Sequence, residues 1–193
     1  MSRYRTRSWR AFDLTAAAPV TLAVSVRILG LDPGSRRTGF GVIECRGNQL
    51  LPVAHGCLNV AGAASGARLR LIFEGLRGLL SEHAPAEVAI ERVFVSRNPD
   101  SALKLGQARG AALCAIPAGI PVFEYAPRAG KLAVVGSGAA EKFQVAHMIR
   151  ALLALVERPG ADAADALALA VCHAHARRAR VLAQTALQRC SRA

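Results

Sequence analysis

The order of strand-like and helix-like segments limits this chain to a small set of folds. Three apolar runs separated by short turns come first, at Val26–Asp32, 39–44 and 51–59. Turn residues between such runs predict an antiparallel meander. The rest of the chain alternates helix-periodic and strand-like segments, at 67–83, 88–94, 101–116, 121–125, 139–156 and 161–178. Strand–helix–strand units have parallel neighbours, so the sequence predicts an α/β fold with a five-stranded mixed sheet and helices on both faces.

Length and composition predict one domain with tails. The chain has 193 residues, and 52 % of them are hydrophobic, enough for a sizeable core. We expect residues 1–26 to be a disordered extension, 27–178 to be the folded domain and 179–193 to be a basic C-terminal tail. No apolar run reaches the roughly 18 residues of a membrane helix. The five cysteines form no CxxC pair, which favours a reducing cytoplasm over a disulfide framework or a zinc site.

The chain is basic, but its charge is unevenly placed. It has 25 Lys and Arg against 13 Asp and Glu, a net charge of +12. Residues 1–26 carry four Arg and one Asp, and residues 176–193 carry five Arg and no acid. This distribution fits a polyanionic partner and fits solvated basic tails equally well.

Two acidic residues belong to predicted strands. Asp32 ends the first strand, where it could cap the turn Pro33–Gly34 or project from the end of the sheet. Glu91 lies in an apolar strand, where a buried carboxylate must be paired or bound to a metal. Arg92 is a poor partner for it, because neighbouring strand residues point to opposite faces; an outward-facing position for Glu91 stays possible.

Two further acids, Asp162 and Asp165, lie three residues apart at the start of the last predicted helix. That spacing puts both on one helical face. One acid would satisfy the helix dipole, whereas two like charges among alanines suit a hard cation. Together with Asp32 and Glu91 they could surround two Mg²⁺ ions, an arrangement that hydrolyses phosphodiesters. By contrast, His173 and His175 do not face each other on a helix, and we expect them at the surface or partly buried.

Several motifs resemble those of the RuvC-type Holliday junction resolvases. Residues 28–35 with Thr38 and Gly39 resemble the first motif, and residues 89–94 with 98–110 resemble the long second one. Residues 121–127 and 140–142 continue the resemblance, and residues 162–168 match the last motif. The resemblance covers residues 27–178.

This resemblance implies a ribonuclease H-like fold and a structure-selective endonuclease of recombination and repair. It implies that Asp32, Glu91, Asp162 and Asp165 are catalytic and hold two Mg²⁺ ions per subunit, with Mn²⁺ as a substitute. The implied enzyme is a homodimer that nicks two like strands of a four-way junction, leaving 5′-phosphate and 3′-hydroxyl ends, and works with the RuvA and RuvB branch-migration complex. The candidate DNA contacts are Phe94, Lys104, Arg109, Lys131 and Lys142.

Two alternatives share the predicted fold. One is a non-catalytic junction-binding module, which would lack one or more of the four acids. The other is a YqgF-like nuclease acting on another nucleic acid, which the segment 98–110 fits less well. The small residues of 107–112 would allow close helix packing, either within the chain or at a dimer interface.

Overall fold

The computed structural model describes residues 25–92 and 98–190, so Phe94 lies outside the described residues. The strands are β1 (Val26–Asp32), β2 (Arg37–Arg46), β3 (Gln49–Asn59), β4 (Glu87–Glu91) and β5 (Val122–Tyr125). The helices are α1 (Ser65–His83), α2 (Pro99–Ala115), α3 (Ala129–Val135), α4 (Lys142–Leu152) and α5 (Ala161–Cys190). None of the helices in these two stretches is long and apolar enough to cross a membrane.

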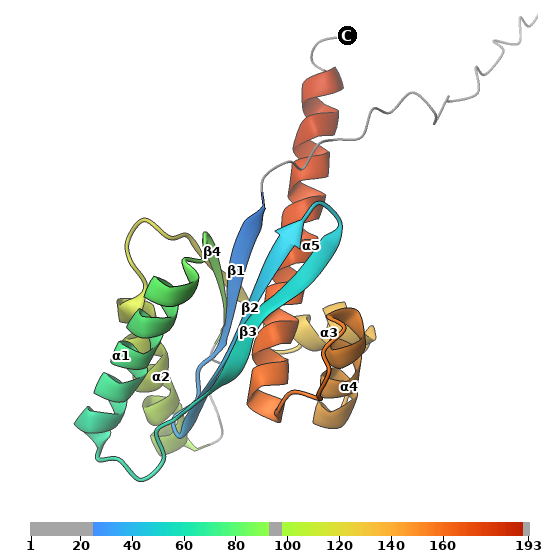
Figure 1. Cartoon of the computed structure of the whole chain (residues 1–193). Coiled ribbons are helices and arrows are strands. Elements are labelled where there is room, and N and C mark those ends of the chain that lie inside the picture. The colour runs from blue at the N-terminus through green and yellow to red at the C-terminus, as the bar shows by residue number, and fades with distance from the viewer. Residues whose placement is uncertain (1–24, 93–97, 191–193) are drawn as a thin grey trace, which may run out of the picture.

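The strands form one five-stranded sheet in the order β3-β2-β1-β4-β5. The first three pair antiparallel, whereas β4 pairs parallel with both β1 and β5. Helices α1 and α2 cover one face, and α3, α4 and α5 cover the other (Figure 1). The predicted mixed sheet with helices on both faces is therefore confirmed.

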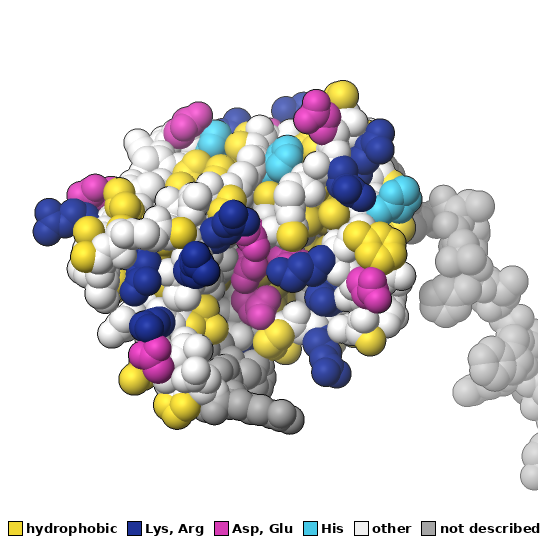
Figure 2. Space-filling model, turned by 90° about the horizontal axis from the view of Figure 1, so that it is seen from below, with side chains coloured by type: hydrophobic (Ala, Val, Ile, Leu, Met, Phe, Trp, Pro, Cys, Tyr) yellow, Lys and Arg dark blue, Asp and Glu magenta, His cyan; other side chains and the backbone are white. Residues whose placement is uncertain are grey.

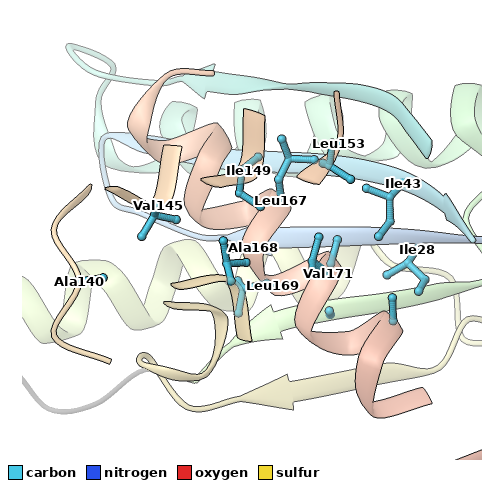
Figure 3. Close-up of a cluster of buried hydrophobic side chains, with 14 of the residues drawn as sticks. Ile28, Ile43, Ala140, Val145, Ile149, Leu153, Leu167, Ala168, Leu169 and Val171 are labelled. Carbon is cyan, nitrogen blue, oxygen red and sulfur yellow. The ribbon is translucent and has the colours of Figure 1, made fainter. Parts of the chain in front are cut away.

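Each face of the sheet has its own hydrophobic core, and strand alternation divides the residues between them. In β1, Leu29 and Leu31 pack in the cluster under α1 and α2. Ile28, which precedes Leu29, packs on the opposite face in the cluster that includes α5 (Figure 3). Because side chains alternate with a period of two, every second residue of β1 faces α5, and this parity decides where Asp32 points.

Helix α5 lies directly on glycines of the sheet. A Cβ on Gly30 would stand 2.0 Å from the carbonyl oxygen of Ala166, and a Cβ on Gly39 would stand 2.1 Å from that of Asp162. The backbones can approach this closely only because both residues lack side chains. The glycines of β1 and β2 therefore bring the first turns of α5 close to the end of β1.

The structure corrects several predicted boundaries. The strand predicted over 88–94 ends at Glu91, so Glu91 terminates its strand instead of lying inside it. Helix α3 was not predicted. Helix α4 is shorter than 139–156 at both ends: a capping box of Glu141 and Gln144 fixes its start at Lys142, and it ends at Leu152. Helix α5 runs to Cys190 instead of ending at 178, since no Gly or Pro interrupts it.

Candidate active site

The ends of β1 and β4 place two carboxylates side by side. Asp32 and Glu91 are the last residues of their strands, and the parallel register pairs Leu31 with Ile90 immediately before them. By parity each points to the α5 face, where Asp165 lies in the second turn of that helix. Three carboxylates distant in sequence therefore meet at one end of the sheet.

These three acids line a cavity of about 490 Å³. Lys131 and Lys142 line it as well, with Pro127, Arg128, Gly130, Gly138, Ala168 and Leu169 completing its walls. Seen from this end of the molecule, acidic side chains gather at the centre with Lys and Arg around them (Figure 2). The site is thus an acidic centre inside a basic rim, as expected for a binding site that attracts a polyanion and holds a cation.

Burial first, and neighbouring carboxylates second, raise the pKa values of these three acids. Burial, followed by the charges of Asp165 and Asp162, raises the pKa of Asp32 to about 6. Burial, followed by Asp32 and Asp165, raises the pKa of Glu91 to about 7. The pKa of Asp165 is also raised, chiefly by burial, against the opposing charges of Lys142 and Lys131. Ionising all three together is therefore unfavourable unless a positive charge joins them.

Asp162 stands apart from this group. Its Oδ2 lies 3.9 Å from Nη1 of Arg37 and 3.8 Å from Sγ of Cys57. It lines a neighbouring cavity of about 670 Å³ on the β3 side of α5, and Lys142 lines both cavities. The structure thus brings three of the four predicted acids into one cavity and leaves the fourth at its border, close enough to act on the pKa values of Asp32 and Asp165.

The acid cluster has the right chemistry for a hard divalent cation. Its donors are carboxylate oxygens, which Mg²⁺ and Mn²⁺ prefer. A cation would offset both the burial and the repulsion that raise their pKa values. As the side chains stand, no three His, Cys, Asp or Glu residues in 25–92 and 98–190 are grouped closely enough to hold a metal. Asp165 instead leans towards Lys142, whose Nζ lies 3.6 Å away, and Asp162 towards Arg37.

The predicted DNA contacts are placed very differently. Lys142 has a side chain that is 62 % exposed beside Asp165, and Lys131 lines the cavity while its Nζ donates to the Ala140 carbonyl at 2.8 Å. Lys104 lies on α2 in an ion pair with Asp100 at 2.6 Å. Arg109 donates to the Glu91 carbonyl and to the Glu124 carboxylate.

Sequence reasoning missed a buried polar cluster that holds Glu87, at the opposite end of β4 from Glu91. His173 was expected at the surface or partly buried, but it is fully buried. Its Nδ1 lies 2.6 Å from the Tyr125 hydroxyl and its Nε2 2.5 Å from a Glu87 carboxylate oxygen, which Arg177 also contacts. These partners are 48 and 86 residues away along the chain, so no local pattern could have indicated them. Arg37 was missed too, since its only signal was its place after the Asp-Pro-Gly-Ser turn.

Comparison with known proteins identifies the family of this chain. The family model described as "Crossover junction endodeoxyribonuclease RuvC" matches residues 28–173. The chain belongs to the RuvC family of crossover junction endodeoxyribonucleases. The RuvC protein of Marinobacter nauticus is 56 % identical over 149 residues, covering 77 % of this chain and 85 % of that protein. The RuvC protein of Alkalilimnicola ehrlichii is 55 % identical over 150 residues, covering 77 % and 91 %.

A solved RuvC structure supports the same assignment. Thermus thermophilus RuvC in complex with a Holliday junction substrate superposes with a TM-score of 0.73 and 34 % identity, covering 80 % of this chain and 96 % of that one. The predicted ribonuclease H-like fold is therefore confirmed, and the chain is a RuvC-family nuclease. Nucleases of the RuvC family are in general metal-dependent, which agrees with the chemistry of the acid cluster.

Proposed function

We propose that this chain resolves Holliday junctions by hydrolysing one phosphodiester in each of two like strands. The observation that carries the proposal is the cavity in which Asp32, Glu91 and Asp165 meet beside Lys131 and Lys142. An acidic centre suits a divalent cation, and a basic rim suits the phosphates of DNA. The family membership of the chain supports the same conclusion.

In this proposal the acids hold the metal and the lysines hold the substrate. Asp32, Glu91 and Asp165 would bind Mg²⁺ or Mn²⁺, with Asp162 joining them by turning from Arg37. Held there, the ions would supply an activated water and charge neutralisation at the leaving oxygen. Loss of the 3′ oxygen as the leaving group would give the proposed 5′-phosphate and 3′-hydroxyl ends. Lys142, largely exposed beside Asp165, can release that carboxylate to the metal and pair with a DNA phosphate instead.

The occupancy of two ions per subunit belongs to the same proposal. Four carboxylates supply enough oxygen ligands for two Mg²⁺ ions only if several water and phosphate oxygens complete their shells. Calorimetric titration of the protein bound to an uncleavable junction analogue, with Mg²⁺ and with Mn²⁺, measures the number of sites. One site in the presence of a junction analogue would reduce the proposal to a single-ion enzyme.

The quaternary part of the proposal is a homodimer that works with the RuvA and RuvB motor. A four-way junction has two-fold symmetry, and two sites related by the same axis address two like strands. The buried face of α2 contributes Ala108 and Ala112 to the intrachain core, so those small residues pack within the chain. A Cβ on Gly106 or Gly110 would meet open space, and these positions remain available to a second copy.

Cleavage of a synthetic mobile four-way junction tests the proposal. We expect symmetric nicks with Mg²⁺, none with EDTA, and none on a linear duplex of the same sequence. Asp32→Asn should bind the junction without cutting it, whereas Asp100→Asn, an exposed acid of α2, should cut at the wild-type rate. If the wild type binds the junction without cutting it, the chain is a non-catalytic binding module. If it cuts the linear duplex as fast as the junction, the proposed junction selectivity is wrong.

Subunit mixing tests the dimer. On a supercoil-extruded cruciform, two coupled nicks give linear plasmid and single nicks give open circles. Adding excess Asp32→Asn protein to wild type should shift the products from linear plasmid to open circles through heterodimers. A proportional dilution of activity, together with a monomer in sedimentation, would contradict the dimer.

A further inference from the structure

We propose that Arg109 is a positioning residue that fixes the carboxyl end of β4 and, with it, Glu91. The inference rests on the proposed function, in which Glu91 is one of the acids that hold the metal. It assigns to Arg109 a role inside the protein, in place of the DNA contact expected from its place in the second motif.

The Arg109 guanidinium joins three elements at the point where β4 ends. From helix α2, its Nε donates to the backbone carbonyl of Glu91 at 3.2 Å, and its Nη2 donates to Oε1 of Glu124 at 2.5 Å. Glu124 belongs to β5, and its second carboxylate oxygen lies 3.5 Å from Nε of Arg92. A planar guanidinium can make two such bonds in fixed directions, so Arg109 holds β4 and β5 at a set distance from α2.

The Glu91 carbonyl depends on a donor from outside the sheet. Pairing between β1 and β4 ends at Leu31 and Ile90, and the chain leaving β1 continues with Pro33, which has no N–H to offer. On the other side, the Arg92 N–H extends the ladder by donating to the Tyr125 carbonyl at 2.7 Å. An unsatisfied, partly buried carbonyl costs roughly 1–3 kcal/mol. The Arg109 bond therefore fixes the backbone carbonyl of Glu91, which is bonded directly to the Cα that carries the Glu91 side chain.

The same contacts remove Arg109 from the surface. Its side chain is 18 % exposed, whereas that of Arg92, which meets the same Glu124, is 59 % exposed. Both arginines carry the same charge near the same end of β4, but the side-chain bond to the Glu91 carbonyl comes from Arg109. This difference makes Arg92 a matched control.

The test compares Arg109→Ala, Arg109→Lys and Arg92→Ala in the full chain. Three quantities are measured: single-turnover cleavage of the junction over a range of Mg²⁺ concentrations, junction Kd without Mg²⁺, and Mn²⁺ binding to the free protein by electron paramagnetic resonance. We expect Arg109→Ala to cleave about 10- to 100-fold more slowly, to require more Mg²⁺, and to bind Mn²⁺ more weakly. Its junction Kd should stay within about twofold, and Arg92→Ala should match wild type in all three measurements within about twofold.

The lysine variant separates positioning from DNA contact. Lysine keeps the charge but cannot make two forked bonds, so Arg109→Lys should remain slow in cleavage and weak in Mn²⁺ binding. Should Arg109→Ala fail to fold, this variant carries the test alone. Wild-type Mn²⁺ affinity and rate in the folded variants would overturn the proposal. So would a loss of junction affinity in Arg109→Ala that Arg109→Lys restores. If wild type itself does not cleave, the proposed function fails, while the Mn²⁺ comparison still decides the role of Arg109.

Discussion

Glu87 and Glu91 stand at the two ends of β4 and point to the same side of the sheet, towards α5, yet their surroundings are opposite. Burial alone would raise the pKa of Glu87, but its bonds to His173 and Arg177 bring that pKa below its ordinary value. Burial and two neighbouring carboxylates instead raise the pKa of Glu91 to about 7. Four residues along one strand therefore separate a carboxylate with a lowered pKa from one with a raised pKa.

The difference indicates which end of the strand is structural and which is functional. Glu87 is compensated inside the protein, so it has little capacity to bind anything else. Glu91, Asp32 and Asp165 are held together by the fold at a free-energy cost, and burial of like charges persists where a site needs them. The glycine contacts of α5 and the Arg109 bonds keep that cluster together despite the repulsion.

The largest expected effect is on cleavage by Glu91→Gln. We expect the rate to fall about 100-fold or more, because the amide removes a charged metal ligand whose contribution is several kcal/mol. Junction Kd should change by no more than about twofold, since phosphate contacts supply most of the affinity. The matched change Glu87→Gln should leave the cleavage rate per folded molecule intact. Equal losses of rate in both folded variants would abolish the distinction between the two ends of β4.

The next effect is on stability. Here we expect Glu87→Gln, and not Glu91→Gln, to show the larger loss. Glu87→Gln should lower the free energy of unfolding by about 2 kcal/mol, because it weakens charged hydrogen bonds to the buried His173 and to Arg177. Urea unfolding measures this change. Glu82→Gln, at a position whose side chain is 72 % exposed, is the control and should stay within about 0.5 kcal/mol of wild type. Coinciding urea unfolding curves for Glu87→Gln and wild type would mean that the buried network contributes nothing to stability.

A pH series in EDTA sharpens the comparison further. The folded-state pKa of Glu91 is raised above its unfolded value, so its contribution to stability is present at low pH and is lost as pH rises towards about 7. Glu87 has a lowered pKa, so its contribution is present above about pH 4.5 and is lost as pH falls. We therefore expect Glu91→Gln to gain stability relative to wild type between pH 5 and 7, by on the order of 1 kcal/mol after solvent screening.

Excess Mg²⁺ is the control for that series. A bound cation compensates the carboxylate charge, so the relative gain of Glu91→Gln should disappear or change sign when Mg²⁺ replaces EDTA. A pH-independent difference between Glu91→Gln and wild type in EDTA would show that Glu91 carries no excess charge repulsion.

Local sequence patterns predicted most of the fold and the composition of the acid cluster, but not its internal arrangement. The Asp-Pro-Gly-Ser turn and the start of the last helix at Ala161 are local features, and the strand order predicts that the acids beside them lie close together. The separation of Asp162 from the other acids depends on Arg37 and Cys57, which local spacing does not reveal. Burial of His173 likewise depends on Glu87 and Tyr125. Helix α3 escaped prediction because it is seven residues long and packs through Gly130 against Ala168, a tertiary contact.

The smallest expected effect comes from shortening α5. This change tests how far along α5 the contacts that stabilise the Glu87 end of β4 extend. Arg177 bonds to Glu87, and Arg180 lies 4.9 Å over the Phe123 ring. The predicted domain boundary at 178 would separate these two arginines, so we propose that the folded domain ends after Arg180. Deleting residues 181–193 keeps both arginines and should change the free energy of unfolding by no more than about 0.5 kcal/mol.

A longer deletion, of residues 177–193, supplies the contrast. It removes the Arg177 bond to Glu87 and should cost about 1–2 kcal/mol, measured by urea unfolding beside the shorter deletion. Cleavage at physiological salt should stay within about twofold of wild type for the shorter deletion. Only its non-specific DNA affinity at low salt should fall, since the removed segment carries Arg189 and Arg192 and no acid. Equal destabilisation by both deletions would place the end of the folded domain beyond Arg180, because the final turns of α5 would then carry the stability assigned here to Arg177.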